Sequence, residues 1–80
     1  MNLDDEKQHL AKADIDIEQA RARIVRQREL VDELRRDGHE TEMAVNLLIT
    51  LQGTLNAMIE HRRLIAARIE QLERDEKRPS

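Results

Sequence analysis

Residues 31–51 read VDELRRDGHETEMAVNLLITL and contain the break that decides the fold. Before Gly38, apolar residues recur every seven positions in a series that ends at Val31, and after it a second series begins at Leu48. A seven-residue repeat keeps one face of a helix against a partner helix. Arginines followed by a glycine are typical of a helix end. The stretch therefore predicts two helices joined by a short turn.

The two series define the helices that we expect. They consist of Leu3, Leu10, Ile17, Ile24 and Val31, and of Leu48, Leu55 and Ile69, with Arg62 where an apolar residue is due. We expect helices over residues 3–37 and 42–75, a turn at 38–41 built on Gly38, His39 and a capping Thr41, and a frayed tail at 76–80. Because so short a connection implies antiparallel neighbours, the predicted fold class is all-α: one domain, residues 1–80, forming a coiled-coil-like antiparallel two-helix hairpin.

Composition narrows the classes of function. The 80 residues include no cysteine and no aromatic residue, 39% are charged, and the net charge is -3. Disulfides and cysteine-based metal sites are excluded. Arginines are frequent between residues 21 and 36, but acidic residues lie among them and no aromatic ring is present for base stacking, so we expect no nucleic-acid partner. The first residues are acidic and lack an apolar segment, so we expect a cytoplasmic protein with no membrane partner.

The second helix carries more apolar surface than one neighbour requires. Residues 43–59 contain no charged side chain, and they are too few and too polar to span a membrane. Ile15 and Val25 also fall outside the seam, either as ordinary surface residues or as a second contact face. A small core without disulfides is marginal, so we expect a homodimer that forms a four-helix bundle. Its predicted contact residues are Leu47, Leu48, Leu51, Leu55, Met58, Ile59, Arg62 and Ile65.

The polar residues offer few candidates for chemistry. His9, His39 and His61 lack the spacing of a helical metal site, so we expect no metal, no cofactor and no enzymatic activity. Arg62 in the seam either fixes the register, by reaching Asp16 or Glu18, or binds a partner. Glu60-His61-Arg62 resembles the phosphoacceptor box of histidine kinases, although the box's following proline or asparagine is absent and the histidine lies on the second helix.

Several segments together resemble a family of small uncharacterised bacterial proteins, mostly alphaproteobacterial. The resemblance covers residues 9–69, and no activity or ligand comes with it. Gly53 departs from the family pattern. The matching segments are His9-Leu10-x-x-Ala13, Arg23-Ile24-x-Arg26-Gln27-Arg28-Glu29-Leu30, Arg36-Asp37-Gly38-His39-x-Thr41-x-x-Ala44-x-x-Leu47-Leu48-x-Thr50-Leu51-x-x-Thr54-Leu55, and His61-Arg62.

We therefore expect a non-enzymatic, self-associating helical module for protein interaction or regulation. The alternative is a signalling-associated phosphotransfer or sensor-linked module that uses His61.

Overall fold

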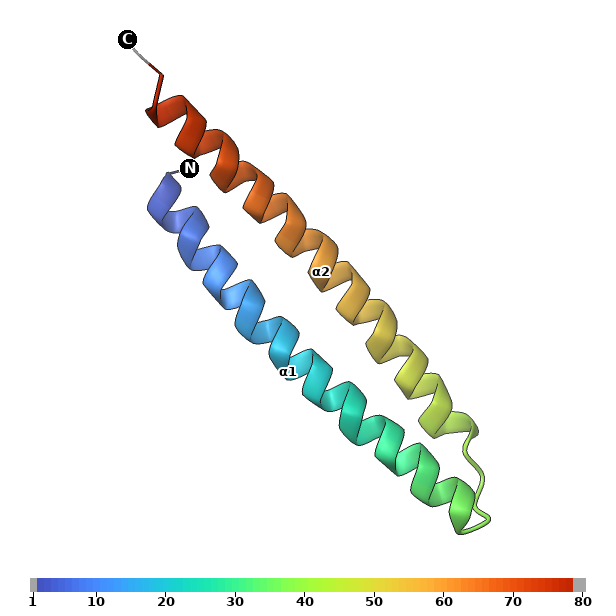
Figure 1. Cartoon of the computed structure of the whole chain (residues 1–80). Coiled ribbons are helices and arrows are strands. Elements are labelled where there is room, and N and C mark those ends of the chain that lie inside the picture. Colours follow the sequence, from blue (N-terminus) through green and yellow to red (C-terminus); the bar gives the residue numbers. More distant parts are fainter. Residues whose placement is uncertain (1, 79–80) are drawn as a thin grey trace.

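The computed structural model describes residues 2–78 and consists of two long helices lying side by side (Figure 1). Helix α1 spans Leu3–Arg36 and helix α2 spans Glu42–Glu76. The two helices run in opposite directions and form a rod of 69 × 15 × 14 Å. The predicted all-α helical hairpin is confirmed. Helix α1 ends one residue earlier and α2 one residue later than expected, and Pro79 and Ser80 of the expected tail lie outside the described residues.

The start of α1 is capped by a residue that the sequence reasoning did not single out. The Asn2 side-chain Oδ1 accepts a hydrogen bond of 2.8 Å from the Asp5 backbone N–H. This satisfies one of the free amide groups of the first helical turn. The acidic side chains of that turn also favour the positive end of the helix dipole. The signal was present in the sequence, because an asparagine directly before three acidic residues is a typical helix start.

The turn has the geometry that its glycine predicts. Gly38 has a φ of 75°, in the left-handed region. The His39 N–H donates to the Leu34 carbonyl at 2.9 Å, and the Gly38 N–H donates to the Arg35 carbonyl at 3.3 Å. These two bonds are the Schellman motif, which satisfies carbonyl groups left free at a helix end. The chain therefore reverses direction here without a buried, unpaired backbone group.

The expected cap of α2 is only half present. Thr41 is the residue before the helix, and its carbonyl accepts from the Val45 N–H at 2.8 Å. Its side chain makes no capping hydrogen bond, so that part of the prediction is wrong. The backbone explains this, because Thr41 has a ψ of -4°, whereas a capping side chain usually projects from an extended residue.

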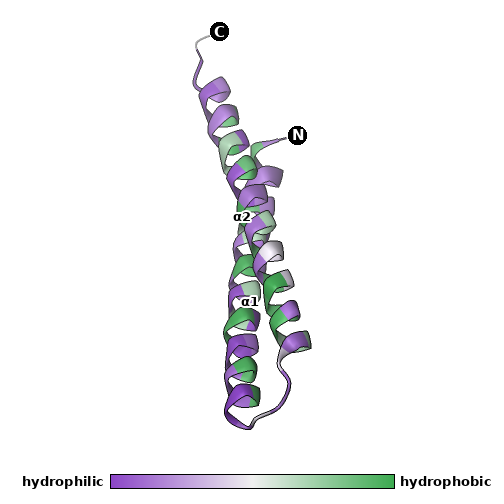
Figure 2. Cartoon of the chain, turned by 90° about the vertical axis from the view of Figure 1, so that its right-hand side faces the viewer, coloured by the Kyte–Doolittle hydropathy of each residue, from purple (hydrophilic) through white to green (hydrophobic). Residues whose placement is uncertain are grey.

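The core is a single line of aliphatic side chains between the helices. Leu3 and Leu10, at the start of the first series, are only half-buried. Figure 2 shows hydrophobic and hydrophilic turns alternating along both ribbons, with hydrophobic turns at the start of α2 next to the loop. Such a core holds two helices together but leaves much of each helix exposed to water. The buried aliphatic residues are Ile17, Ile24, Val31, Ile65 and Ile69.

Candidate functional site

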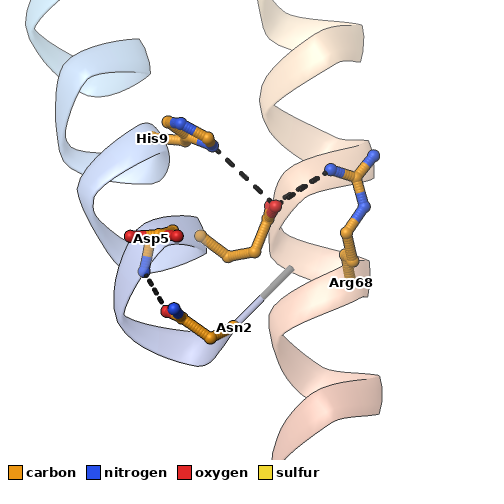
Figure 3. A network of polar contacts seen from close by, with 5 residues as sticks. Asn2, Asp5, His9 and Arg68 are labelled. Atoms are coloured by element: carbon orange, nitrogen blue, oxygen red, sulfur yellow. Dashed lines mark hydrogen bonds and ion pairs between the residues drawn. The ribbon is translucent and has the colours of Figure 1, made fainter.

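A buried ion pair lies at the open end of the hairpin, where α1 begins and α2 ends. Glu6 on α1 is only 1% exposed. Arg68 on α2 donates from Nη1 to both of its carboxylate oxygens, at 3.3 and 3.1 Å. His9 Nδ1 lies 3.8 Å from Glu6 Oε1, and both contacts are drawn in Figure 3. A carboxylate removed from water must be paired, so this contact fixes the alignment of the helices.

Arg62 occupies the seam position where an apolar residue is due, and it turns its guanidinium out of the core. Its Nε donates to the Asp14 carboxylate on α1. The prediction that Arg62 reaches Asp16 or Glu18 is therefore wrong. Asp14 lies beside the seam on the flank where the guanidinium emerges, whereas Asp16 accepts a 3.0 Å hydrogen bond from Lys12. The hydrogen bond that Arg62 donates to Asp14 raises the pKa of Arg62 above its ordinary value.

Both neighbours of His61 in the phosphoacceptor-like segment are held in ion pairs. Arg63 donates two hydrogen bonds to the Glu60 carboxylate, at 3.0 and 2.6 Å. These bonds lower the pKa of Glu60 below 4.5 and raise that of Arg63. Arg62 is bound to Asp14, as described above. His61 itself is exposed on α2.

The three histidines are far apart in the hairpin. His9 lies at the open end, His39 in the turn and His61 on α2, and all three are exposed. Among residues 2–78, no group of three or more histidine, cysteine or acidic side chains is placed to hold a metal ion. Neither helix in this range is long and apolar enough to cross a membrane.

One groove contains the residue types of a catalytic triad without its geometry. Asp16, Thr54 and His61 line a groove of about 250 Å³ together with alanine and methionine side chains. The Thr54 hydroxyl donates to the Thr50 carbonyl of its own helix at 3.0 Å. Within the described residues, no hydrogen bond joins His61 to Asp16 or Thr54. A nucleophile requires a base within hydrogen-bond reach, whereas the hydroxyl of Thr54 is bonded to its own helix.

The residues expected to contact a partner fall into three groups. Ile65 is 3% exposed and is enclosed by the hairpin itself, so it has no surface to offer a partner. Leu47 and Ile59 are 49% and 39% exposed and remain open. The other five are half-buried, with one side on the seam and the other facing water; they are Leu48, Leu51, Leu55, Met58 and Arg62.

Sequence reasoning missed part of the exposed apolar surface. Leu30, Met43, Ile49 and Leu64 are 43%, 86%, 60% and 49% exposed, and none of them was expected at a contact. Leu30 lies directly before the seam residue Val31, and Met43, Ile49 and Leu64 lie beyond the positions that flank a two-helix seam. The signal that could have found them is a continuation of seven-residue spacing outside the seam. The row of positions that contains Leu47 continues through Thr54 and His61. The row that contains Met43 continues through Ala57 to Leu64.

Two grooves run along opposite sides of the seam. We call the first the Val25 face; its main hollow, of about 530 Å³, is lined by Arg21, Ile24, Val25, Arg28, Gln52, Leu55 and Asn56. It continues toward the turn between Val31, Asp32, Arg35, Val45 and Leu48. We call the second the Thr54 face; its hollows are lined by Ala13, Asp16, Thr54, Ala57, Met58 and His61, and by Gln19, Ala20, Arg23 and Leu51.

Seven-residue spacing assigns the exposed apolar residues to these faces. Leu30 follows Arg23 in one row of α1, and Met43, Leu47 and Leu64 share rows with Ala57 and Thr54 on α2. Four of the exposed apolar side chains therefore lie on the Thr54 face. The Val25 face carries Val25, Ile49 and Ile59, and Ile15 lies on neither. The Thr54 face is therefore the richer in exposed apolar side chains.

Comparison of the chain with known protein families, with curated proteins and with solved structures found no match.

Proposed function

We propose that the chain is a non-enzymatic helical module that binds a second copy of itself, forming a four-helix bundle that serves protein interaction or regulation. The observation that carries this proposal is the exposed apolar surface of α2 in and beside the charge-free residues 43–59. Met43, Leu47 and Ile49 are 86%, 49% and 60% exposed there. In a chain that is 39% charged, an uncharged segment of this kind is best explained by contact with another protein surface.

The thin seam supports the same proposal. Within residues 2–78, only five aliphatic side chains are buried between the helices. A single small core without disulfides or metal supplies only about 3–5 kcal/mol of stability. Complete burial of a leucine or isoleucine contributes about 1.5–3 kcal/mol, so each half-exposed side chain covered in a dimer adds roughly 1 kcal/mol, once in each copy. Association therefore supplies stabilisation that one hairpin lacks.

The non-enzymatic part of the proposal is supported by the shape of the molecule. Its hollows are open grooves along a rod rather than enclosed cavities. A typical substrate site instead encloses its ligand and brings several polar groups together. Grooves between two helices are suited to a third helix.

The test is the oligomeric state of the purified chain, measured by sedimentation equilibrium at micromolar concentration. We expect a dimer. Leu47→Asp places a charge in the apolar surface and should give monomer. Ile15→Asp is the matched control, because Ile15 is 58% exposed but lies on neither face, and it should leave the dimer intact. A wild-type monomer with full helicity at this concentration would overturn the proposal.

A further inference from the structure

We infer that the Thr54 face is the self-association surface, and that the second copy lies on it with its turn at the opposite end. The inference rests on the proposed self-association and adds the face, the orientation and the register. It begins from Leu30, Met43, Leu47 and Leu64, which are exposed on this face. The question is which arrangement of two identical hairpins brings such residues together.

Two apolar residues of this face, Leu47 and Leu64, are self-complementary in an antiparallel pair. Leu47 and Leu64 lie equally far from the point midway between residues 55 and 56. When two copies of α2 cross antiparallel with this point on a two-fold axis, Leu47 of each copy lies opposite Leu64 of the other. Both side chains are 49% exposed in the single hairpin, so the two contacts remove four half-exposed leucines from water.

Small side chains lie where the two copies of α2 would approach most closely. Thr54 and Ala57 are the residues of this face nearest to the same midpoint, one on each side. Both are exposed, and both line the hollow of about 250 Å³. Because neither side chain is large, two helix backbones can pack closely at this level, and each Thr54 then lies opposite Ala57 of the other copy.

Charges on α1 are complementary in the same arrangement. Asp16 and Arg26 lie five residues before and five residues after Arg21. When two antiparallel copies of α1 cross with the axis at the level of Arg21, each Asp16 lies opposite Arg26 of the other copy. Within residues 2–78, Arg26 takes part in no ion pair, so its guanidinium is available for this contact. Opposite charges at two symmetric points fix the register.

The two registers agree to within one helical turn, although each was derived from a different helix. A single two-fold axis must cross both helices at the same height. The Glu6–Arg68 and Asp14–Arg62 contacts put Arg21 level with about residues 53–55 of α2, so the two midpoints lie within one helical turn of each other. Packing with both turns at the same end would instead set α1 on α2 and bring Leu30 near Met43 of the other copy, without the Leu47–Leu64 pairs.

Cysteine pairs test the face and the orientation together. The chain contains no cysteine, so each single-cysteine variant carries one thiol. An equimolar mixture of Thr54→Cys and Ala57→Cys, oxidised mildly, should form mainly the mixed disulfide, which mass spectrometry separates from the two homodimers. The matched control is a mixture of Gln52→Cys and Ile59→Cys. These residues lie symmetrically about the same midpoint but on the Val25 face, and we expect no mixed disulfide.

A charge exchange tests the register. Arg26→Asp removes two attractive pairs and sets like charges opposite each other at the same two points. Each exposed pair contributes a few tenths of a kcal/mol, so the four changes together should weaken the dimer roughly tenfold. Asp16→Arg combined with Arg26→Asp should restore much of the affinity. Arg28→Asp on the Val25 face is the control and should change the dissociation constant less than Arg26→Asp.

The outcomes separate this inference from the proposed function. A dimer that forms the 54–57 disulfide and regains affinity on charge exchange supports the inference. A dimer that forms the 52–59 disulfide, or neither disulfide, overturns the face and orientation while self-association stands. A dimer with the 54–57 disulfide but no rescue overturns the register. A wild-type monomer overturns both proposals.

Discussion

Replacing Arg68 should reveal how strongly the open end of the hairpin depends on one ion pair. Arg68→Met keeps the length of the side chain but leaves the Glu6 carboxylate buried without its partner. Loss of one partner of a fully buried pair lowers the free energy of unfolding by about 3–5 kcal/mol. The Arg68 side chain is 40% exposed while that of Glu6 is 1% exposed. One end of the pair is therefore open to water, and we expect a loss of about 2–3 kcal/mol.

The assay is urea denaturation followed by circular dichroism, with all variants at one protein concentration because association contributes to stability. With a slope of about 1 kcal/mol per molar urea, the midpoint should fall by roughly 2–3 M. Glu6→Leu combined with Arg68→Met should return stability to within about 1 kcal/mol of wild type or above it. Arg74→Met is the control, since Arg74 binds Glu70 with both side chains about two-thirds exposed, and it should change stability by less than about 0.5 kcal/mol. A midpoint unchanged by Arg68→Met, or a double variant as unstable as Arg68→Met alone, would refute the reasoning.

The two glycines should respond oppositely to alanine in the same denaturation assay. Gly53→Ala should raise stability by about 0.5–1 kcal/mol, because a Cβ there meets nothing within 4 Å and alanine favours a helix. Gly38→Ala should lower stability by about 1–2 kcal/mol, because Gly38 has a left-handed φ of 75° that alanine adopts only with strain. If both alanine variants shifted stability in the same direction, this reasoning would be contradicted. In an NMR titration, the Glu60 carboxyl should have a pKa below 4.5 that moves toward 4.5 in Arg63→Gln. Because this pKa is lowered by folding, the stabilisation by Arg63 is present at neutral pH and is lost as the pH falls through the pKa of folded Glu60; an unchanged pKa in the variant argues against the pairing. Incubation with a phosphorylated response regulator should leave His61 unlabelled, and a label lost in His61→Asn would favour phosphotransfer.

The fold was largely predictable because it depends on local signals. Seven-residue spacing and Gly38 are sufficient to place both helices to within one residue, since helix stops and seam positions are properties of neighbouring residues. The cap of α2 was not predictable in the same way. Whether Thr41 caps depends on its ψ angle, which is determined by how the loop spans the two helices. The partner of Arg62 was missed for a related reason, because it depends on the hairpin register.

The contact surface was only partly predictable. The sequence shows that α2 has a wide apolar face, but it does not show how that face is divided between the other helix of the hairpin and a partner. Ile65 shares its repeat with residues that remain half-exposed, yet it is enclosed. Conversely, Leu30 and Leu64 lie outside the seam, and only the placement of both helices shows that they share one exposed face. How such a face is divided between the hairpin and a partner depends on the rotation of each helix about its own axis. The packing of the two helices sets that rotation.

The order in which the hairpin closes follows from the separation of its cross-links along the chain. The bond from Gln27 to the Ala44 carbonyl joins residues 17 apart, whereas the Glu6–Arg68 pair joins residues 62 apart. Each doubling of a loop adds about 0.6 kcal/mol of closure entropy, so contacts beside the turn form early and those at the open end form last. Interactions absent from the folding transition state act mainly on the unfolding rate. The Glu6–Arg68 pair therefore governs how long a closed hairpin survives, while the Gly38 turn governs how quickly it forms.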